Sequence, residues 1–352
     1  MSSASPARRS LLLAALATAA ILAGCAQPPP APPPPPPPPP AVSLSSKLIE
    51  QASAYRAYMA RATVISPAFG NGQDVAQALR TGEAYEPSQL LRGAIVYGAI
   101  AALQDPTYVA GVRTYVNDPE QRRTVAYAIM KDPAYAAGIT GSASAAGLVI
   151  AALGDDGRKL LDQGRSVKQA AYDVQHSPWS KAEVAGRDTR LLLAKQLSAT
   201  PGAGEVAETT RLQAASVGAG TLGVAAGAAQ PPYTPPVVRS LAVAALAALG
   251  YAQDENLEQV MPLLAEPTTV TCLNMSKLNL YQCLAVAKPH YEDVFCLGTH
   301  VMEDTGTCLV RSVGLIAPPD PRVEAAKAAA AQAAKMTKVS SKRRPVRKRA
   351  HR

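Results

Sequence analysis

Four cysteines on either side of the Lys288-Pro289 dipeptide constrain the fold of this chain more than any other feature of its sequence. The inner two lie six residues before and seven residues after Pro289, and the outer two lie seventeen before and nineteen after it. Residues 274–287 and 290–303, which flank the dipeptide, have the pattern of helices. In an antiparallel helical hairpin that turns at Pro289, the cysteines therefore face one another at two matched levels.

The geometry of such a hairpin decides between the possible disulfide pairings. Consecutive cysteines such as Cys272 and Cys283 are about 16 Å apart along one helix at 1.5 Å per residue. A disulfide tolerates Cα separations of at most about 7 Å. We therefore predict nested disulfides, Cys272 with Cys308 and Cys283 with Cys296. We also expect Asp304-Thr305-Gly306 to end the second helix at its glycine.

The arrangement resembles the twin-cysteine helical hairpins of the coiled-coil-helix family, from which we take only the geometry. That family spaces its cysteines by nine residues, whereas this chain has ten and eleven between them. His290 and His300 lie among the cysteines, so a zinc site is an alternative. Structural zinc sites use cysteines two to four residues apart, and no such pair occurs here. We expect no metal and no other cofactor, with both histidines on helix faces or caps.

The remaining sequence predicts an all-α fold, an irregular array of short packed helices with the disulfide-stapled αα-hairpin at its C-terminal end. Alanine is abundant and favours helix, and the chain has only two Phe and one Trp. Repeated Asp-Pro dipeptides predict helix starts, because Asp caps the first amides and Pro suits the first helical position. They begin at Asp105, Asp118 and Asp132, and Ser177-Pro178 and Thr200-Pro201 repeat the device. We expect the tyrosines that follow to be interior or half-buried, namely Tyr108, Tyr115, Tyr127 and Tyr135.

The first 24 residues have the organisation of a secretory signal peptide. Arg8 and Arg9 supply a basic start, and the apolar run at 11–23 is too short to span a bilayer. The Leu22-Ala23-Gly24-Cys25 sequence that follows resembles the lipobox of bacterial lipoproteins. The resemblance implies that the chain is cut before Cys25, and that the cysteine sulfur and the new amine are acylated.

A proline-rich segment follows the lipobox. Every residue from 28 to 40 is proline except Ala31. Such a run adopts polyproline II at about 3.1 Å per residue, which makes a semi-rigid spacer of roughly 40 Å. Ala26 and Gln27 resemble the residues that follow the lipidated cysteine in outer-membrane lipoproteins. This resemblance implies a lipid-anchored envelope protein in the outer membrane facing the periplasm, an oxidising compartment in which disulfides persist.

These observations predict five segments. The boundary at residue 231 is set by four prolines that break the helical pattern, Pro231, Pro232, Pro235 and Pro236. The segments are a signal peptide (1–24), a lipid anchor and polyproline spacer (25–42), a helical domain (43–230), a helical domain with the disulfide hairpin (231–320), and an Ala-rich helix with a basic disordered tail (321–352).

The basic character of the chain belongs to its C-terminal tail. Residues 323–352 hold ten Lys or Arg and one Glu, which equals the net charge of +9 of the whole chain. Export makes anionic envelope partners the expected ones, namely peptidoglycan, lipopolysaccharide or another envelope protein. Nucleic acid is not favoured, because no aromatic residues interleave the charges. A solubilising tail without a specific partner is the alternative. The candidate binding residues are Lys342, Arg343, Arg344, Arg347, Lys348, Arg349 and Arg352.

No catalytic motif of a known hydrolase or nucleotide-binding enzyme occurs in the sequence. The carboxylate pairs Asp155-Asp156 and Glu303-Asp304 are adjacent in sequence, and we expect both in solvated turns. The sequence therefore predicts a structural or interaction role rather than an enzyme. The alternative is an envelope enzyme, such as a cell-wall hydrolase, whose site is assembled from dispersed residues. A pocket lined by converging carboxylates, tyrosines or His176 would favour that alternative.

Overall fold

The computed structural model describes residues 40–342, with side chains up to residue 335, and its regular structure is helical. Between residues 40 and 342 no β-strand occurs, and Glu183 and Pro289 form an isolated bridge. The all-α prediction is confirmed. The helices of this unit are α2 (Ser46–Ala62), α3 (Gly72–Glu83), α4 (Pro87–Ala102), α5 (Pro106–Arg113), α6 (Pro119–Lys131), η1 (Pro133–Gly138), α7 (Ser142–Val174), α8 (Pro178–Lys181), α9 (Arg187–Ala199), α10 (Val206–Ser216), α11 (Pro235–Leu249), η2 (Asp254–Asn256), α12 (Leu257–Val260), η3 (Met261–Leu264), α13 (Pro267–Val286), α14 (His290–Cys296), η4 (Leu297–Glu303), α15 (Asp304–Ser312) and α16 (Pro321–Lys342).

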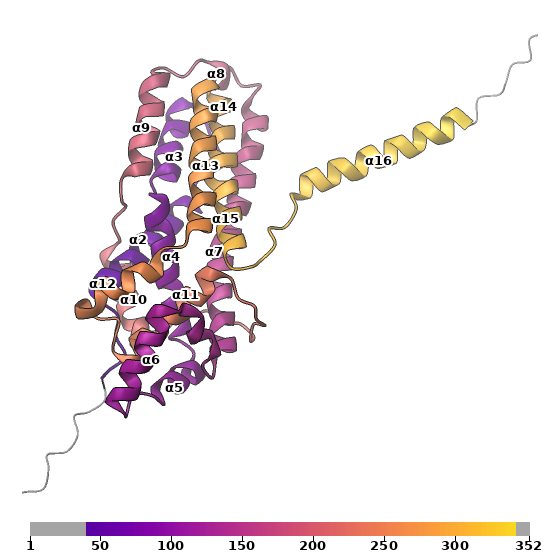
Figure 1. Ribbon diagram of the computed structural model, residues 1–352. Helices are drawn as coiled ribbons and strands as arrows, with labels where there is room; N and C mark the ends of the chain where they lie inside the picture. Colours follow the sequence, from indigo (N-terminus) through magenta and orange to yellow (C-terminus); the bar gives the residue numbers. More distant parts are fainter. Residues whose placement is uncertain (1–39, 343–352) are drawn as a thin grey trace, which may run out of the picture. The chain divides into compact units, whose positions relative to one another are not determined.

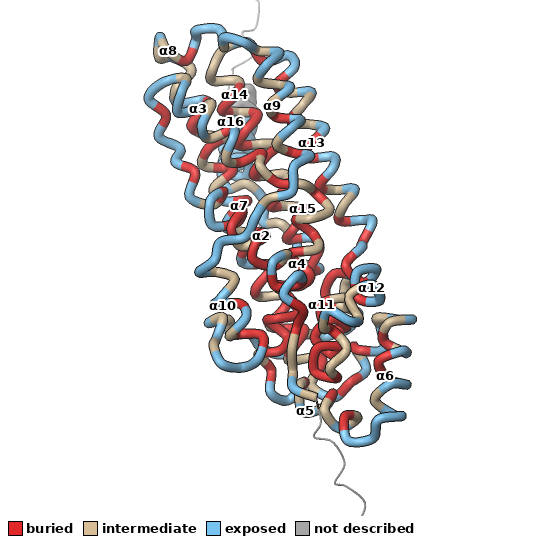
Figure 2. The backbone as a smooth tube through the Cα atoms, turned by 90° about the vertical axis from the view of Figure 1, so that its left-hand side faces the viewer, coloured by how far each residue is buried: buried red, intermediate tan, exposed pale blue. Residues whose placement is uncertain are grey.

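Helix α7, of 33 residues, extends along most of the packed helices. Figure 1 shows α3, α9, α13 and α14 gathered at one end of the packed helices, and α5, α6 and α12 at the other. Apolar residues at helical spacing favour one buried face on each helix. Figure 2 shows buried residues concentrated on the central helices, with exposed ones on the outer turns.

The predicted Asp-Pro helix starts are confirmed. The carboxylates of Asp105, Asp118 and Asp132 accept hydrogen bonds from first-turn amides at 2.8–3.0 Å. Ser177 likewise precedes α8. The prediction for Thr200-Pro201 is wrong, because Thr200 is the C-cap of α9. Proline is common just after a helix end, since it cannot continue the helix.

The tyrosines that follow these starts do not share one environment. Tyr108 is fully buried, and its hydroxyl donates to the Leu241 carbonyl oxygen at 3.0 Å. Tyr115 is half-buried. Tyr127 and Tyr135 are 66% and 43% exposed, so the expectation of interior packing is wrong for them. Both lie on the outer side of short helices, which have only one face to bury.

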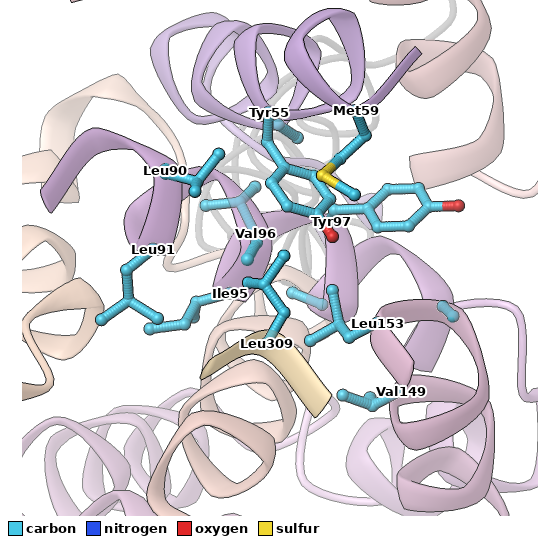
Figure 3. Close-up of a cluster of buried hydrophobic side chains, with 14 of the residues drawn as sticks. Tyr55, Met59, Leu90, Leu91, Ile95, Val96, Tyr97, Val149, Leu153 and Leu309 are labelled. Carbon is cyan, nitrogen blue, oxygen red and sulfur yellow. The ribbon is translucent and has the colours of Figure 1, made fainter. Parts of the chain in front are cut away.

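The centre of the core lies where α2, α4, α7 and α15 meet. Figure 3 shows Tyr55 and Met59 from α2 facing Ile95 of α4, with Leu153 of α7 and Leu309 of α15 beside them. All five side chains are 1% exposed or less. Removal of this apolar surface from water is the main favourable contribution to the fold.

The adjacent acidic residues of α7 do not form a turn. Asp155 and Asp156 lie inside the helix, so the expectation of a solvated turn is wrong. Asp156 is 7% exposed, and the hydroxyl of Tyr55 donates to its Oδ2 at 3.0 Å. The Arg56 guanidinium donates to its Oδ1 at 2.6 Å. We call Arg56 and Asp156 the core ion pair.

Glu303 and Asp304 are also helical rather than in a solvated turn, because the second arm of the hairpin continues through them. Glu303 pairs with Lys168 at 3.1 Å. Asp304 Oδ2 lies 2.9 Å from His300 Nδ1, which places this histidine on a helix face.

Gly306 does not end a helix, as the sequence predicted, but allows two helices to approach closely. A Cβ at Gly306 would lie 2.5 Å from the backbone nitrogen of Leu161 in α7. Real Cβ atoms essentially never come this close, so α15 could not pack here with a larger residue. The second arm therefore continues to Ser312. The chain leaves the helix at Gly314, whose φ of +79° suits glycine.

The nested cysteine pairing is confirmed. Cys272 and Cys308 are bonded with a Cα separation of 5.8 Å, and Cys283 and Cys296 with 5.7 Å. The first arm is longer than expected, because Glu266 caps a helix that begins at Pro267. The second arm contains the π-helical segment η4, a form found frequently at functional sites.

Residues from Pro40 onward form one compact unit. The prolines at 231–236 connect α10 to α11, and helices on both sides of them share one hydrophobic core. The predicted boundary therefore does not separate two cores. Helix α16 runs from Pro321 to Lys342. No described helix combines the length and apolarity that a membrane crossing needs.

Candidate binding groove between helices α3, α9 and α14

A groove of about 440 Å³ lies between α3, the start of α9 and the start of α14. Its lining is mostly apolar. The lining residues are Gly72, Ala76, Leu79, Arg80, Glu83, Val184, Ala185, Gly186, Thr189, Arg190, Leu193, His290 and Asp293.

One face of α3 forms the long wall. Its lining residues Gly72, Ala76, Leu79 and Glu83 recur every three or four residues, the spacing of one helix face. Eleven residues at 1.5 Å per residue make this wall about 16 Å long. A Cβ at position 72 would overlap the imidazole ring of His290, so a larger residue there would require this ring to shift.

Glu83 stands at one end of this wall. It is only 2% exposed, and its Oε2 has no hydrogen-bond partner within the described residues. Burial raises the pKa of the Glu83 carboxyl to about 7, and the nearby cations Lys277 and Arg80 only partly oppose this. An acid with this pKa is a mixture of protonated and ionised forms at neutral pH.

Arg190 and Asp293 form a buried ion pair at the base of the groove. The Arg190 guanidinium donates to the Asp293 carboxylate and to the backbone carbonyl of Leu284. Burial raises the pKa of Asp293 to about 6 although Arg190 opposes the shift. The Arg190 Nε–H is buried and has no partner within the described residues. The Asp293 carboxylate is therefore hydrogen-bonded to Arg190, whereas the Arg190 Nε–H has no partner within the described residues.

A second buried cation, Lys277 of α13, lies behind Glu83. Its Nζ donates to the Glu83 backbone carbonyl at 2.6 Å and lies 3.4 Å from the centroid of the Tyr85 ring. Burial lowers the pKa of Lys277 well below its ordinary value. The Tyr85 hydroxyl and the Thr305 hydroxyl are 2.7 Å apart, which ties this cluster to α15 just beyond the π-helical segment.

His290 closes the other end of the groove. Its ring centroid lies 6.4 Å from that of Trp179. Burial, with a smaller contribution from Arg190, lowers the pKa of His290, so this imidazole is neutral at pH 7. His290 is the first residue of α14, and the N-cap of this helix is Pro289. Among the described residues, no group of three or more His, Cys, Asp or Glu could hold a metal ion.

The candidate residues from the sequence do not line the groove. Cys25 lies outside the described residues, as do all the basic tail positions except Lys342, whose backbone ends α16. Cys272 and Cys308 bridge α13 to α15, and Cys283 and Cys296 bridge α13 to α14. His176 lies in the turn after α7 and is not part of the lining.

The groove residues were missed because they come from separate segments with no common motif. Glu83 ends α3, Arg190 lies in the first turn of α9, and Asp293 lies in α14. One signal was present in the sequence. Lys277 is the only charged residue between 267 and 286, and a lone lysine in such a helix is a candidate for burial.

No family model, curated protein or solved structure matches this chain. Its function is therefore inferred from its own residues.

Proposed function

We propose that this chain is a lipid-anchored protein of the bacterial cell envelope with a structural or interaction role, facing the periplasm from the outer membrane. The observation that carries the proposal is Leu22-Ala23-Gly24-Cys25 directly after a short apolar run with a basic start. The two nested disulfides support it, because disulfides persist in oxidising compartments and are rare in the cytosol.

The outer side of α13 supports the interaction role. Lys277, the only charged residue of this 20-residue helix, is buried. Met275, Leu278 and Val286 are exposed by 48%, 44% and 74%. Met275 and Leu278 are three residues apart and so lie on one face of the helix, and contiguous exposed apolar surface marks interaction sites.

The anchor is tested by the Cys25→Ser substitution, with Ala26→Ser as the matched control. Mass spectrometry of the N-terminal peptide should find the wild type and the control beginning at a lipid-modified Cys25. The Cys25→Ser protein should keep its first 24 residues or appear without lipid. A wild-type protein with an unmodified N-terminus elsewhere would contradict the anchor.

The basic tail is proposed to contact anionic wall polymers or lipid. Replacement of its seven candidate residues by Gln should abolish salt-sensitive pull-down on purified peptidoglycan and on anionic vesicles, with neutral vesicles as the control. Such attraction is screened over about 8 Å at physiological ionic strength, so moderate added salt should mimic the substitution. Equal binding by both proteins at every salt concentration would show that the tail only solubilises the chain.

One observation favours the alternative, an envelope enzyme such as a wall hydrolase. The raised pKa of Glu83 in a groove is what a general acid requires. Asp293, the other carboxylate, is held by Arg190, so the groove offers a single free carboxyl and binding is the better-supported role. Release of soluble fragments from peptidoglycan by the wild type but not by Glu83→Gln would favour the enzyme. No release by either protein would favour binding.

A further inference from the structure

The segment between α15 and α16 follows α7 toward the C-terminal end of that helix. Leu315 lies against Gly154, since a Cβ at this glycine would be 2.6 Å from the Leu315 Cδ1 atom. The Arg165 guanidinium donates to the Pro318 carbonyl. The Arg322 guanidinium donates in turn to the Arg165 carbonyl at 3.0 Å. These contacts hold the start of α16 beside Arg165 on α7.

The N-terminal side of the chain joins the packed helices near the opposite end of α7. The Pro40 carbonyl accepts a hydrogen bond from Arg113 of α5 at 3.1 Å. Helix α5 lies against the N-cap of α7, because a Cβ at Gly141 would be 2.4 Å from the backbone nitrogen of Tyr108. Arg165 comes 24 residues after Gly141, which is about 36 Å along the helix at 1.5 Å per residue. The start of α16 is therefore separated along α7 from the end at which the N-terminal side enters.

Helix α16 has its lysines on one side. At 100° per residue, the four lysine positions fall within about 80° of arc. They are Lys327, Lys335, Lys338 and Lys342, which we call the lysine face. Glu324 pairs with Lys327 at 3.0 Å, so four lysines and one glutamate leave this side with a formal charge of +3. Residues 321–335, the part of α16 whose side chains the structure describes, are all exposed.

The net charge of the chain is concentrated on this helix and the residues after it. Residues 323–352 contain ten Lys or Arg and one Glu, which equals the net charge of +9 of the whole chain. The residues before 323 therefore sum to zero. Attraction of a polyanion is thus expected at α16 and beyond rather than on the packed helices.

The composition of α16 favours a polymer over a lipid surface. A helix that lies in a membrane interface buries large apolar side chains such as Trp, Phe and Leu on the side opposite its cations. Helix α16 contains none of these three, and its apolar residues are alanine, Val323, Met336 and Val339. The carboxylates of peptidoglycan can pair with lysines without any apolar insertion.

We propose that the lysine face of α16 binds the carboxylates of peptidoglycan, and not the lipid of the membrane that holds the anchor. The inference rests on the proposed lipid anchor, because the anchor precedes Pro40 and α16 begins about 36 Å further along α7. The predicted polyproline spacer adds roughly 40 Å to the path from the lipid. The position of α16 thus directs its charge toward the wall.

The first test uses the full chain held by its lipid in phosphatidylcholine vesicles and mixed with fluorescent peptidoglycan. Wild-type vesicles should carry peptidoglycan with them on flotation. Replacement of the lysine face by Gln should reduce this capture about tenfold, since each exposed ion pair contributes a modest amount. The matched control replaces four exposed cations of the packed helices by Gln and should capture as the wild type does. These are Arg123, Lys131, Lys159 and Lys181.

Equal capture by the wild type and the lysine-face variant, or capture by neither, would overturn the proposal. A chain that itself fails to float with the vesicles would instead contradict the anchor. In that case, sedimentation with peptidoglycan in the absence of vesicles still tests the lysine face.

The second test asks whether lipid competes for α16. Ser341→Cys supplies one free thiol for a fluorophore, because the four cysteines of the hairpin form disulfides and Cys25 carries the lipid. Energy transfer to an acceptor lipid is measured in vesicles of phosphatidylcholine and of phosphatidylglycerol. We expect the same low transfer in both. Higher transfer in phosphatidylglycerol that added salt reverses would assign α16 to the lipid surface and overturn the proposal.

Discussion

The core ion pair and the Glu83 carboxyl are both buried acids near cationic side chains, but their partners differ. Both oxygens of Asp156 are hydrogen-bonded, one to Arg56 at 2.6 Å and the other to Tyr55 at 3.0 Å. Glu83 Oε2 has no partner within the described residues, and the pKa of its carboxyl rises to about 7. The first arrangement holds helices together, whereas the second leaves a buried acceptor without a partner in a residue that lines the groove.

The comparison is informative because breaking a buried ion pair leaves an uncompensated charge, whereas removing a carboxyl oxygen that has no partner does not. Arg56 connects α2 to α7 through Asp156, and its buried Nε, which makes no hydrogen bond within the described residues, lies 3.6 Å from Glu208 of α10. The groove instead combines a committed pair, Arg190 and Asp293, with an unsatisfied acid.

The largest expected effect is at the core ion pair. Asp156→Ala removes the partner of a largely buried Arg56 and of the Tyr55 hydroxyl. Breaking such a pair costs roughly 3–5 kcal/mol, and we expect the lower end because Arg56 keeps Glu208. Urea unfolding measures the loss. Asp155→Ala is the control, since the Asp155 side chain is 65% exposed and its removal should change stability by less than about 0.5 kcal/mol.

The second effect concerns pH. Glu83 has a folded pKa of about 7 against an ordinary value of 4.5, so between these values the folded state keeps a proton that the unfolded state releases. Its contribution to stability is therefore present below pH 4.5 and is lost as pH rises to about 7. The loss is on the order of 2–3 kcal/mol. Denaturant unfolding of wild type and Glu83→Gln across pH 4.5–7.5 measures it. Parallel profiles for the two proteins would show that Glu83 has ordinary solvation.

The third effect is smaller and of opposite sign to the first. Glu83→Leu removes an unsatisfied buried carboxyl but leaves the bond from Lys277 to the backbone carbonyl at position 83 intact. We expect a gain of about 1 kcal/mol at pH 7.5, because a buried group without a partner carries its full desolvation penalty. Thermal unfolding checks the sign. A loss of stability comparable to that of Asp156→Ala would show that the Glu83 carboxyl has a stabilising partner, as Asp156 has in the core ion pair.

The sequence allowed prediction of those features that depend on nearby residues. Asp105 and Asp118 cap helices because their own neighbours supply the amides. The nested cysteines follow from their distances to Pro289. Gly306 was misassigned because glycine serves both as a helix stop and as a close-packing residue, and only the position of Leu161 on α7 distinguishes these uses.

The groove could not be predicted for a related reason. Glu83, Arg190 and Asp293 belong to separate segments, and nothing in any one segment shows that it meets the others. The prediction for Asp155 and Asp156 was wrong for the same reason. Their adjacency in the sequence suggested a solvated turn, but Asp156 is buried because Arg56 of α2 packs against it. Tertiary packing decides which charges are satisfied, and local sequence does not contain that information.

The most direct test is a carboxyl ¹³C NMR titration of Glu83 in the full chain. The free protein should show Glu83 titrating near pH 7. A Glu83 pKa near 4.5 would contradict a buried carboxyl with an unsatisfied oxygen at this position.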